Sequence, residues 1–136
     1  MKRRPPAELT DALARYAELL RRYHGTLDLM SDAGLARLDE HVADAQVYAE
    51  VIAALKPEPR RLLDVGSGAG LPGVVIAAAL PDLEVELVER RRKRATFLRM
   101  ATAAVGRPDV TVHDADVRRT RGPDVEVVTA QAVARL

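Results

Sequence analysis

The residues with the clearest capacity for chemistry form one glycine-rich segment from Asp64 to Gly73, which reads Asp-Val-Gly-Ser-Gly-Ala-Gly-Leu-Pro-Gly. Glycines allow the backbone to turn sharply and to approach a ligand closely. Pro72 suits the first turn of a helix, because the N–H that proline lacks has no helical partner there. A short apolar run precedes the segment and a helical pattern follows it. The sequence therefore predicts a strand-to-helix turn that holds a ligand, with a tight structural turn as the alternative.

The spacing of the glycines distinguishes two kinds of ligand. A dinucleotide-binding loop reads Gly-x-Gly-x-x-Gly and needs a small residue where this chain has Leu71. The pattern here is Asp-x-Gly-x-Gly-x-Gly, which is typical of methyltransferases that use S-adenosylmethionine. We expect that cofactor, and consider a nicotinamide-dependent reductase only as a distant alternative. The loop residues expected to bind the cofactor are Asp64, Gly66, Ser67, Gly68, Gly70 and Leu71.

Acidic residues that follow the predicted strands complete this cofactor site. Asp64 can lie near the ammonium group of the cofactor, whose amino acid portion has no counterpart in a dinucleotide. Glu89, at the end of the second strand, can accept hydrogen bonds from both ribose hydroxyls. After the third strand, Asp114 or Asp116 can accept from the adenine amino group, or else cap a helix. Ala115 lies between them, and we include it in the site.

Two more groups of residues are candidates for the substrate side. His41 and Asp44 are one helical turn apart and can line the mouth of a pocket, although such a pair is often structural. The chain also has five consecutive basic residues, 90–94, at the start of a predicted helix. They can hold the phosphates of a nucleic acid, or simply form a solvated helix face. The three expected to contact RNA are Arg92, Lys93 and Arg94.

The composition limits the other classes of function. A chain of 136 residues with 48% hydrophobic and 30% charged residues is typical of one globular domain. The absence of cysteine excludes a disulfide framework and a thiolate metal site, and three scattered histidines give no reason to expect a metal. No run is long and apolar enough for a membrane span or a signal peptide, so we expect a cytoplasmic protein that does not bind membranes.

Alternating strands and helices must position these residues. Two amphipathic helices come first, and strands and helices then alternate, which predicts an α/β doubly wound fold with a parallel sheet. We expect a helical cap over residues 1–57 and a Rossmann-like S-adenosylmethionine-binding region over 58–136, together forming one compact domain. The predicted helices cover residues 7–24, 35–55, 71–80 and 91–105, and the predicted strands cover 62–65, 85–88, 110–113 and 125–129.

The chain resembles the small-subunit ribosomal RNA methyltransferase G family, also called glucose-inhibited division protein B. The loop from Asp64 to Gly73 matches the family's Asp-Val-Gly-Thr/Ser-Gly-x-Gly-Leu-Pro-Gly, and the Leu-Pro-Gly extension is its most specific part. Residues 93–99 match the family's Lys-Arg-x-x-Phe-Leu-Arg. His41-x-x-Asp44 falls where the family has Arg-His-x-x-Asp-Ser, and residues 27–30 occupy its Tyr-Asn-Leu-Thr position. The resemblance covers residues 20–136.

The chain also departs from the family's pattern. Glu40 and Ala45 replace the arginine and serine around the histidine and aspartate. Gln131 stands where the family has an arginine implicated in the active site, and Asp116 stands where it has another arginine. Members of the family continue past the fourth strand, so we expect a truncated parallel sheet in the order 3-2-1-4. Its fourth strand, 125–129, would be an exposed apolar edge through which two copies could pair as a homodimer.

The resemblance implies a methyltransferase that modifies nitrogen 7 of a guanine in the 16S rRNA of the small ribosomal subunit. The catalytic candidates that it suggests are His41, Asp44 and Gln131. Two alternatives stay open, namely a relative that acts on another substrate and a catalytically impaired chain that binds the cofactor as an assembly or regulatory module. Because Gln131 cannot supply a guanidinium charge, we expect weak methylation of rRNA by this chain alone.

Overall fold

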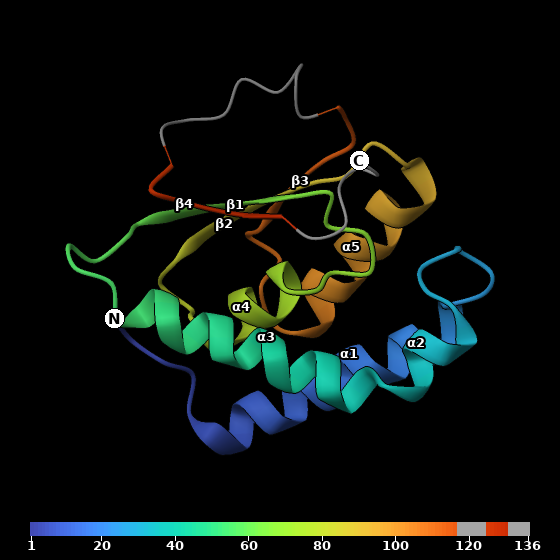
Figure 1. Cartoon of the computed structure of the whole chain (residues 1–136), viewed down its shortest axis with the longest axis horizontal. Helices are drawn as coiled ribbons and strands as arrows, with labels where there is room; N and C mark the ends of the chain where they lie inside the picture. Colours follow the sequence, from blue (N-terminus) through green and yellow to red (C-terminus); the bar gives the residue numbers. More distant parts are fainter. Residues whose placement is uncertain (117–124, 131–136) are drawn as a thin grey trace.

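The computed structural model describes residues 1–116 and 125–130 of the chain. Over these residues it is an α/β structure in which helices pack on a four-stranded sheet (Figure 1). In chain order the elements are α1 (Pro6–Tyr23), α2 (Asp32–Ala36), α3 (Leu38–Ala53), β1 (Arg61–Val65), α4 (Gly73–Ala79), β2 (Glu84–Val88), α5 (Arg92–Ala104), β3 (Thr111–His113) and β4 (Val127–Ala130).

The sheet is parallel throughout and has the strand order β3-β2-β1-β4, which confirms the order expected from the sequence. In the register of the central strand, Leu62 lies between Val85 of β2 and Val127 of β4. The carboxyl ends of all four strands therefore meet at one edge of the sheet. In open α/β sheets, this edge is where ligands bind.

Three helices precede the sheet, whereas the sequence predicted two. The Oγ atom of Ser31 accepts a hydrogen bond of 3.0 Å from the backbone N–H of Gly34 and so begins the short helix α2. Arg37, with φ −105° and ψ 19°, leaves the helical conformation and separates α2 from α3. The predicted second helix, 35–55, therefore corresponds to the end of α2 and the whole of α3. The other predicted boundaries differ from the observed ones by one or two residues.

The described helices lie on one face of the sheet (Figure 1). The units β1-α4-β2 and β2-α5-β3 both step in the same direction along the sheet, and right-handed crossovers then place α4 and α5 on the same face. Of the helices that precede the sheet, α3 packs chiefly on α4, and α1 packs on α4 and α5.

Helix α4 is the centre of the core, because it lies between the sheet and the layer formed by α1 and α3. All seven of its residues are buried. Buried residues of α1, α3, α4, α5, β1 and β2 form one continuous hydrophobic cluster. The division into a helical cap, 1–57, and a binding region, 58–136, stays a prediction.

A buried arginine closes the carboxyl end of α4. The guanidinium of Arg107 donates hydrogen bonds to the carbonyl oxygens of Ala77, Leu80 and Leu83 at 2.7, 2.9 and 2.7 Å. The last carbonyls of a helix have no partner within the helix, so a buried helix end needs donors of this kind. Asp109 balances the charge through two contacts near 3 Å, and Arg107 holds the pKa of that carboxyl below its ordinary value. The sequence analysis did not identify this residue.

Candidate functional site

The glycine-rich segment forms the predicted turn at the carboxyl end of β1. Gly66, Gly68 and Gly70 have φ values of 68°, 52° and 95°, which favour glycine because a Cβ atom is strained in that region. The backbone N–H groups of Gly66 and Ser67 donate to the carbonyl oxygen of Val88 at 2.9 and 3.1 Å. The N–H of Gly70 donates to the carbonyl oxygen of Ser67 at 2.7 Å. The turn is thus fixed both to itself and to β2.

Two glycines at the end of the loop are required by packing. A Cβ atom on Gly70 would lie 2.6 Å from Cγ2 of Val74, closer than real carbon atoms approach. A Cβ atom on Gly73 would overlap Oδ2 of Asp64 and lie 2.6 Å from Cδ2 of Leu87. Gly73 therefore allows the start of α4 to press directly onto β1 and β2, whereas Gly70 allows the loop to pack against Val74 of α4. Close packing of the helix on the sheet explains the glycine of the Leu-Pro-Gly extension.

Asp64 points toward the helical face of the sheet and is 1% exposed. Its Oδ1 atom accepts a hydrogen bond of 2.8 Å from the hydroxyl of Thr129 on β4, whereas Oδ2 is buried without a hydrogen-bond partner beside Gly73. Burial raises the pKa of this carboxyl to about 6, and the hydrogen bond from Thr129 partly offsets that rise. The carboxylate lies between β1, β4 and α4, where it can position the loop from below. Its place near the ammonium group of the cofactor stays a prediction.

Glu89 follows β2 and binds the loop directly. Its Oε2 atom accepts a hydrogen bond of 2.9 Å from the N–H of Gly68, and its Oε1 atom accepts one of 3.0 Å from the N–H of Arg91. A carboxylate has about four acceptor positions, so two are left for a ligand such as a ribose diol. A Cβ atom on Gly68 would approach nothing closer than 3.7 Å, and its neighbours would be the Gly66 carbonyl and the guanidinium of Arg94. Gly68 and Glu89 are both buried, and a Cβ atom on Gly68 would be in ordinary van der Waals contact with these two groups.

The segment after β3 lies next to this carboxylate. The backbone N–H of Glu89 donates to the carbonyl oxygen of His113 at 3.0 Å, which brings the following residues, Asp114, Ala115 and Asp116, beside the end of β2. The Asp114 side chain is 31% exposed, and Ala115 and Asp116 are half-buried. This arrangement matches the predicted order of ribose and adenine contacts along neighbouring strands. The contacts themselves stay predictions.

The predicted catalytic pair lies beside Leu71, at the end of the glycine-rich loop. Ser67 is buried, and its hydroxyl donates to the backbone carbonyl of Asp64 at 3.0 Å. His41 and Asp44 of α3 line a small recess together with Leu71 of the loop. The recess is completed by Ala45, Tyr48 and Pro72. The structure thus brings the pair to the loop, as expected, and their catalytic role stays a prediction.

Some side chains of the basic run are exposed to solvent, whereas others are bound to neighbouring residues. Lys93 is exposed. The side chain of Arg92 is 90% exposed, and its ion pair with the carboxylate of Asp114 is long at 3.8 Å. Arg94 is partly buried, and its Nε atom donates to the backbone carbonyl of Asp28 at 2.9 Å. Arg92 and Lys93 are therefore available to a polyanion. Arg94 instead ties the connection between α1 and α2 to the start of α5, so its expected role in RNA binding is less well supported.

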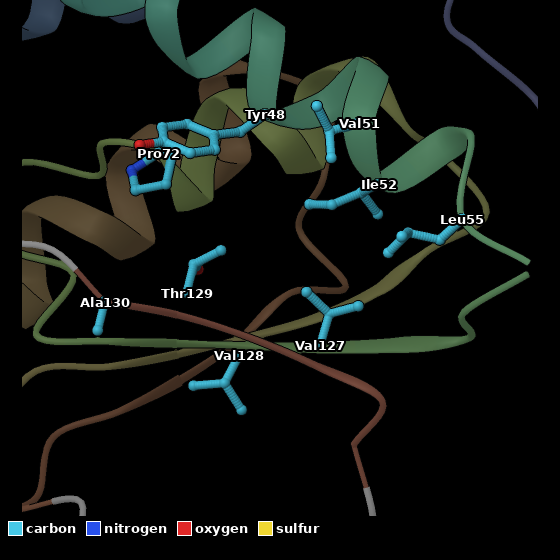
Figure 2. A pocket seen from close by; sticks show the side chains of 9 residues that line it. All are labelled: Tyr48, Val51, Ile52, Leu55, Pro72, Val127, Val128, Thr129 and Ala130. Carbon is cyan, nitrogen blue, oxygen red and sulfur yellow. The ribbon is translucent and has the colours of Figure 1, made fainter.

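An apolar groove of about 320 Å³ lies between α3 and the edge strand β4 (Figure 2). Figure 2 shows Val127 and Thr129 pointing toward α3, whereas Val128 points to the other side of the sheet. Val128 is 59% exposed, and Val51 on α3 is 55% exposed. The lining residues are Tyr48, Val51, Ile52, Leu55, Pro72, Val127, Val128, Thr129 and Ala130. The groove reaches Pro72, so it borders the same loop as the recess with His41.

Comparison with known proteins agrees with the loop and its surroundings. A family model described as GidB, rRNA small subunit methyltransferase G, matches residues 9–136. The chain belongs to this family. Ribosomal RNA small subunit methyltransferase G of Acidothermus cellulolyticus is 42% identical over 91% of this chain and 54% of its own length. The protein of the same name from Leptothrix cholodnii is 38% identical over 93% of this chain and 59% of its own length. The chain thus spans a little more than half of these relatives.

Solved structures of other methyltransferases have a similar fold. An amino pentose methyltransferase from Micromonospora echinaspora is 30% identical, with a TM-score of 0.53 over 65% of this chain and 35% of its own. An O-methyltransferase from Bacillus cereus is only 14% identical, but its TM-score is 0.60 over 87% of this chain and 54% of its own. The second likeness concerns the fold alone. Together they confirm the Rossmann-like class I methyltransferase fold that the sequence predicted.

One of the three catalytic candidates lies outside the described residues, and one contact to the loop was not expected from the sequence. Gln131, the third catalytic candidate, lies outside the described residues. Tyr16 lies within the first amphipathic helix that the sequence predicted, and its hydroxyl donates to the loop carbonyl of Ala69 at 2.6 Å. The apolar periodicity of a helix gives no signal for such a contact. The signal lies only in the residue type, because a buried tyrosine hydroxyl usually has a partner.

In residues 1–116 and 125–130, no group of three or more histidine, aspartate and glutamate side chains is arranged to hold a metal ion. None of the helices in the same residues combines the length and the apolar character that a membrane span requires.

Proposed function

We propose that this chain binds S-adenosylmethionine and transfers its methyl group to nitrogen 7 of a guanine in 16S rRNA of the small ribosomal subunit. The observation that carries the proposal is the hydrogen bond from the N–H of Gly68 to Glu89, which leaves other acceptor positions of that carboxylate for the ribose of a cofactor. The membership of the GidB family supports the choice of reaction and substrate. The cytoplasmic location predicted from the sequence is part of the proposal.

The residues around the loop have separate roles in holding the cofactor. Glu89 would accept from the ribose hydroxyls with the acceptor positions that Gly68 and Arg91 leave open. The segment 114–116 would contact the adenine. The Asp64 carboxylate would keep β1, β4 and the start of α4 in register from below the loop.

Methyl transfer to this acceptor asks little acid–base chemistry of the protein. When bound, S-adenosylmethionine supplies an electrophilic methyl group on its sulfonium. Nitrogen 7 of guanine is an unprotonated acceptor with a free lone pair, so no residue has to remove a proton before the transfer. Catalysis then depends on holding the two reactants in line. We assign His41 and Asp44, which lie beside Leu71, to positioning the guanine at the mouth of the site.

Arg92 and Lys93 are the proposed contacts to the RNA backbone, because both are exposed at the start of α5 near the segment 114–116. Contacts of lysine and arginine with phosphates release counterions, so binding weakens as salt concentration rises. Replacing both residues with glutamine should lower the affinity for small ribosomal subunits and reduce its salt dependence. Affinity for S-adenosylmethionine should stay unchanged, which separates RNA binding from cofactor binding.

Calorimetric titration with S-adenosylmethionine and S-adenosylhomocysteine tests the cofactor assignment. Gly68→Val should abolish binding, because a β-branched residue is strained at a φ of 52° and would distort the loop at its hydrogen bond with Glu89. Gly25→Val is the matched control, since a Cβ atom there meets nothing within 4 Å. A folded wild-type chain that binds neither compound at millimolar concentration would refute the assignment. Transfer of labelled methyl groups to isolated small subunits then tests the substrate.

We also propose that two copies pair through the free edge of β4. This strand is at the end of the described sheet, and Val128 exposes 59% of its surface beside it. An antiparallel pairing across a two-fold axis would satisfy both edges at once. Light scattering at micromolar concentration should detect a dimer that Val128→Lys dissociates. A wild-type chain that is monomeric throughout this range would refute the pairing.

A further inference from the structure

Helix α1 reaches the cofactor loop through one side chain. Tyr16 is completely buried in the middle of α1, and its hydroxyl donates a hydrogen bond of 2.6 Å to the backbone carbonyl of Ala69. Ala69 lies between the second and third glycines of the loop. A residue of the first helix therefore contacts the backbone of the turn that follows the first strand.

The surroundings of Tyr16 fix both the position and the protonation of the hydroxyl. The ring packs against Phe97 of α5 with a centroid distance of 6.5 Å. A Cβ atom on Gly70 would lie 3.2 Å from the hydroxyl oxygen, so the loop backbone passes directly over it. Burial, and then the nearby Asp64 carboxylate, raise the pKa of Tyr16 above its ordinary value. The hydroxyl consequently stays neutral and acts as a donor.

The peptide that Tyr16 holds belongs to a short chain of hydrogen bonds. On one side of Ala69, the N–H of Gly70 donates to the carbonyl oxygen of Ser67 at 2.7 Å. On the other side, the N–H of Gly68 donates to Glu89 at 2.9 Å. Fixing the carbonyl of Ala69 restricts rotation of the peptide between these two glycines. Glycine-rich backbone has many accessible conformations, so an external anchor removes freedom that the loop would otherwise lose on binding.

We propose that Tyr16 is a positioning residue for the cofactor loop, acting through its hydroxyl on the carbonyl of Ala69 so that the loop is arranged for S-adenosylmethionine before the cofactor binds. The proposal rests on the proposed function, since it concerns the same loop. On this proposal, α1 contributes to the cofactor site through Tyr16, in addition to packing on α4 and α5. A merely structural role would depend on the ring, which packs on Phe97, and not on the hydroxyl.

Tyr16→Phe tests the hydroxyl alone, because it keeps the ring. Tyr23→Phe is the matched control, since it removes a hydroxyl from the end of the same helix, away from the loop. One net hydrogen bond is worth roughly 1 kcal/mol, which corresponds to about a fivefold change in an equilibrium constant. We expect Tyr16→Phe to raise the Kd for S-adenosylhomocysteine about fivefold, and Tyr23→Phe to leave it within about twofold.

Hydrogen exchange in the protein without cofactor gives a second readout. The amides of Gly68 and Gly70 should exchange about five times faster in Tyr16→Phe, whereas the amide of Val105 at the end of α5 should not change. Unchanged exchange at both glycines, together with an unchanged Kd, would overturn the proposal, even if the variant were less stable. If the wild type binds no cofactor, the proposed function fails, and the exchange rates still decide whether Tyr16 holds the loop.

Discussion

Adding a single methyl group at Gly73 should destabilise the protein, because the space for it is already filled. Gly73 is the first residue of α4, and its missing Cβ atom allows the Asp64 carboxylate and Leu87 to approach the helix backbone. In Gly73→Ala, the new atom would overlap Oδ2 of Asp64 and lie 2.6 Å from Cδ2 of Leu87. Either the helix must move away from the sheet or Asp64 must leave its hydrogen bond with Thr129.

The magnitude follows from these two routes. Forcing one methyl group into a packed core costs roughly 1–3 kcal/mol. Displacing Asp64 would cost about 1 kcal/mol for the hydrogen bond from Thr129. Replacing glycine with alanine also reduces the entropy of the unfolded chain, which returns about 0.4–1 kcal/mol. Since the two routes are alternatives, we expect a net loss of about 1 kcal/mol in the free energy of unfolding.

Urea denaturation followed by circular dichroism measures this loss. Gly25→Ala is the control, because a Cβ atom there meets nothing within 4 Å, and its stability should change by less than about 0.5 kcal/mol. A double-mutant cycle with Asp64→Ala isolates the clash, since that change removes the carboxylate. The two substitutions should be coupled by about 1 kcal/mol, so that Gly73→Ala costs less when Asp64 is absent. Full stability of Gly73→Ala, or additive effects in the cycle, would refute the reasoning.

Two other predictions concern buried charges. Arg107→Ala should lower the free energy of unfolding by about 3 kcal/mol in urea denaturation, because it removes the guanidinium donors from the carbonyls around the end of α4. Arg99→Ala, on the exposed side of α5, should cost less than about 1 kcal/mol. Equal losses in the two variants would contradict the role given to Arg107. The pKa of Asp64 rises from 3.8 to about 6 on folding, so this carboxyl contributes stability below pH 4 that is lost as the pH rises through 6. Relative to Asp64→Asn, the wild type should lose about 2 kcal/mol between pH 4 and pH 7, and a constant difference would show that burial does not perturb this carboxyl.

Local sequence patterns were sufficient to predict the strands, the long helices and the turn of the site. The apolar run 62–65 followed by three spaced glycines predicts a strand-to-helix turn, because few other residues adopt the positive φ values that this turn requires. The acidic residue at the end of the next strand follows from the topology, since neighbouring parallel strands end at the same edge. The position of Glu89 beside Gly68 was therefore predictable in outline.

The break between α2 and α3 was harder to predict. The apolar spacing of residues 35–55 continues across Arg37 and suggests one helix. The cap from Ser31 to the N–H of Gly34 is a local signal that was present in the sequence. It competes with the periodicity, and a single sequence does not show which of the two decides the boundary.

The sequence by itself determined the kind of site, its glycine loop and the alternation of strands and helices, because these depend on backbone geometry and on periodic burial. The order of the strands was implied by the resemblance to the family. Only the tertiary structure decided what each polar side chain does. Asp64 accepts a hydrogen bond from Thr129, Arg94 holds Asp28, Tyr16 reaches Ala69, and Arg107 closes α4. Each of these contacts joins residues distant in the chain, and its geometry depends on how whole helices pack. Spacing along a single sequence carries no information about that packing.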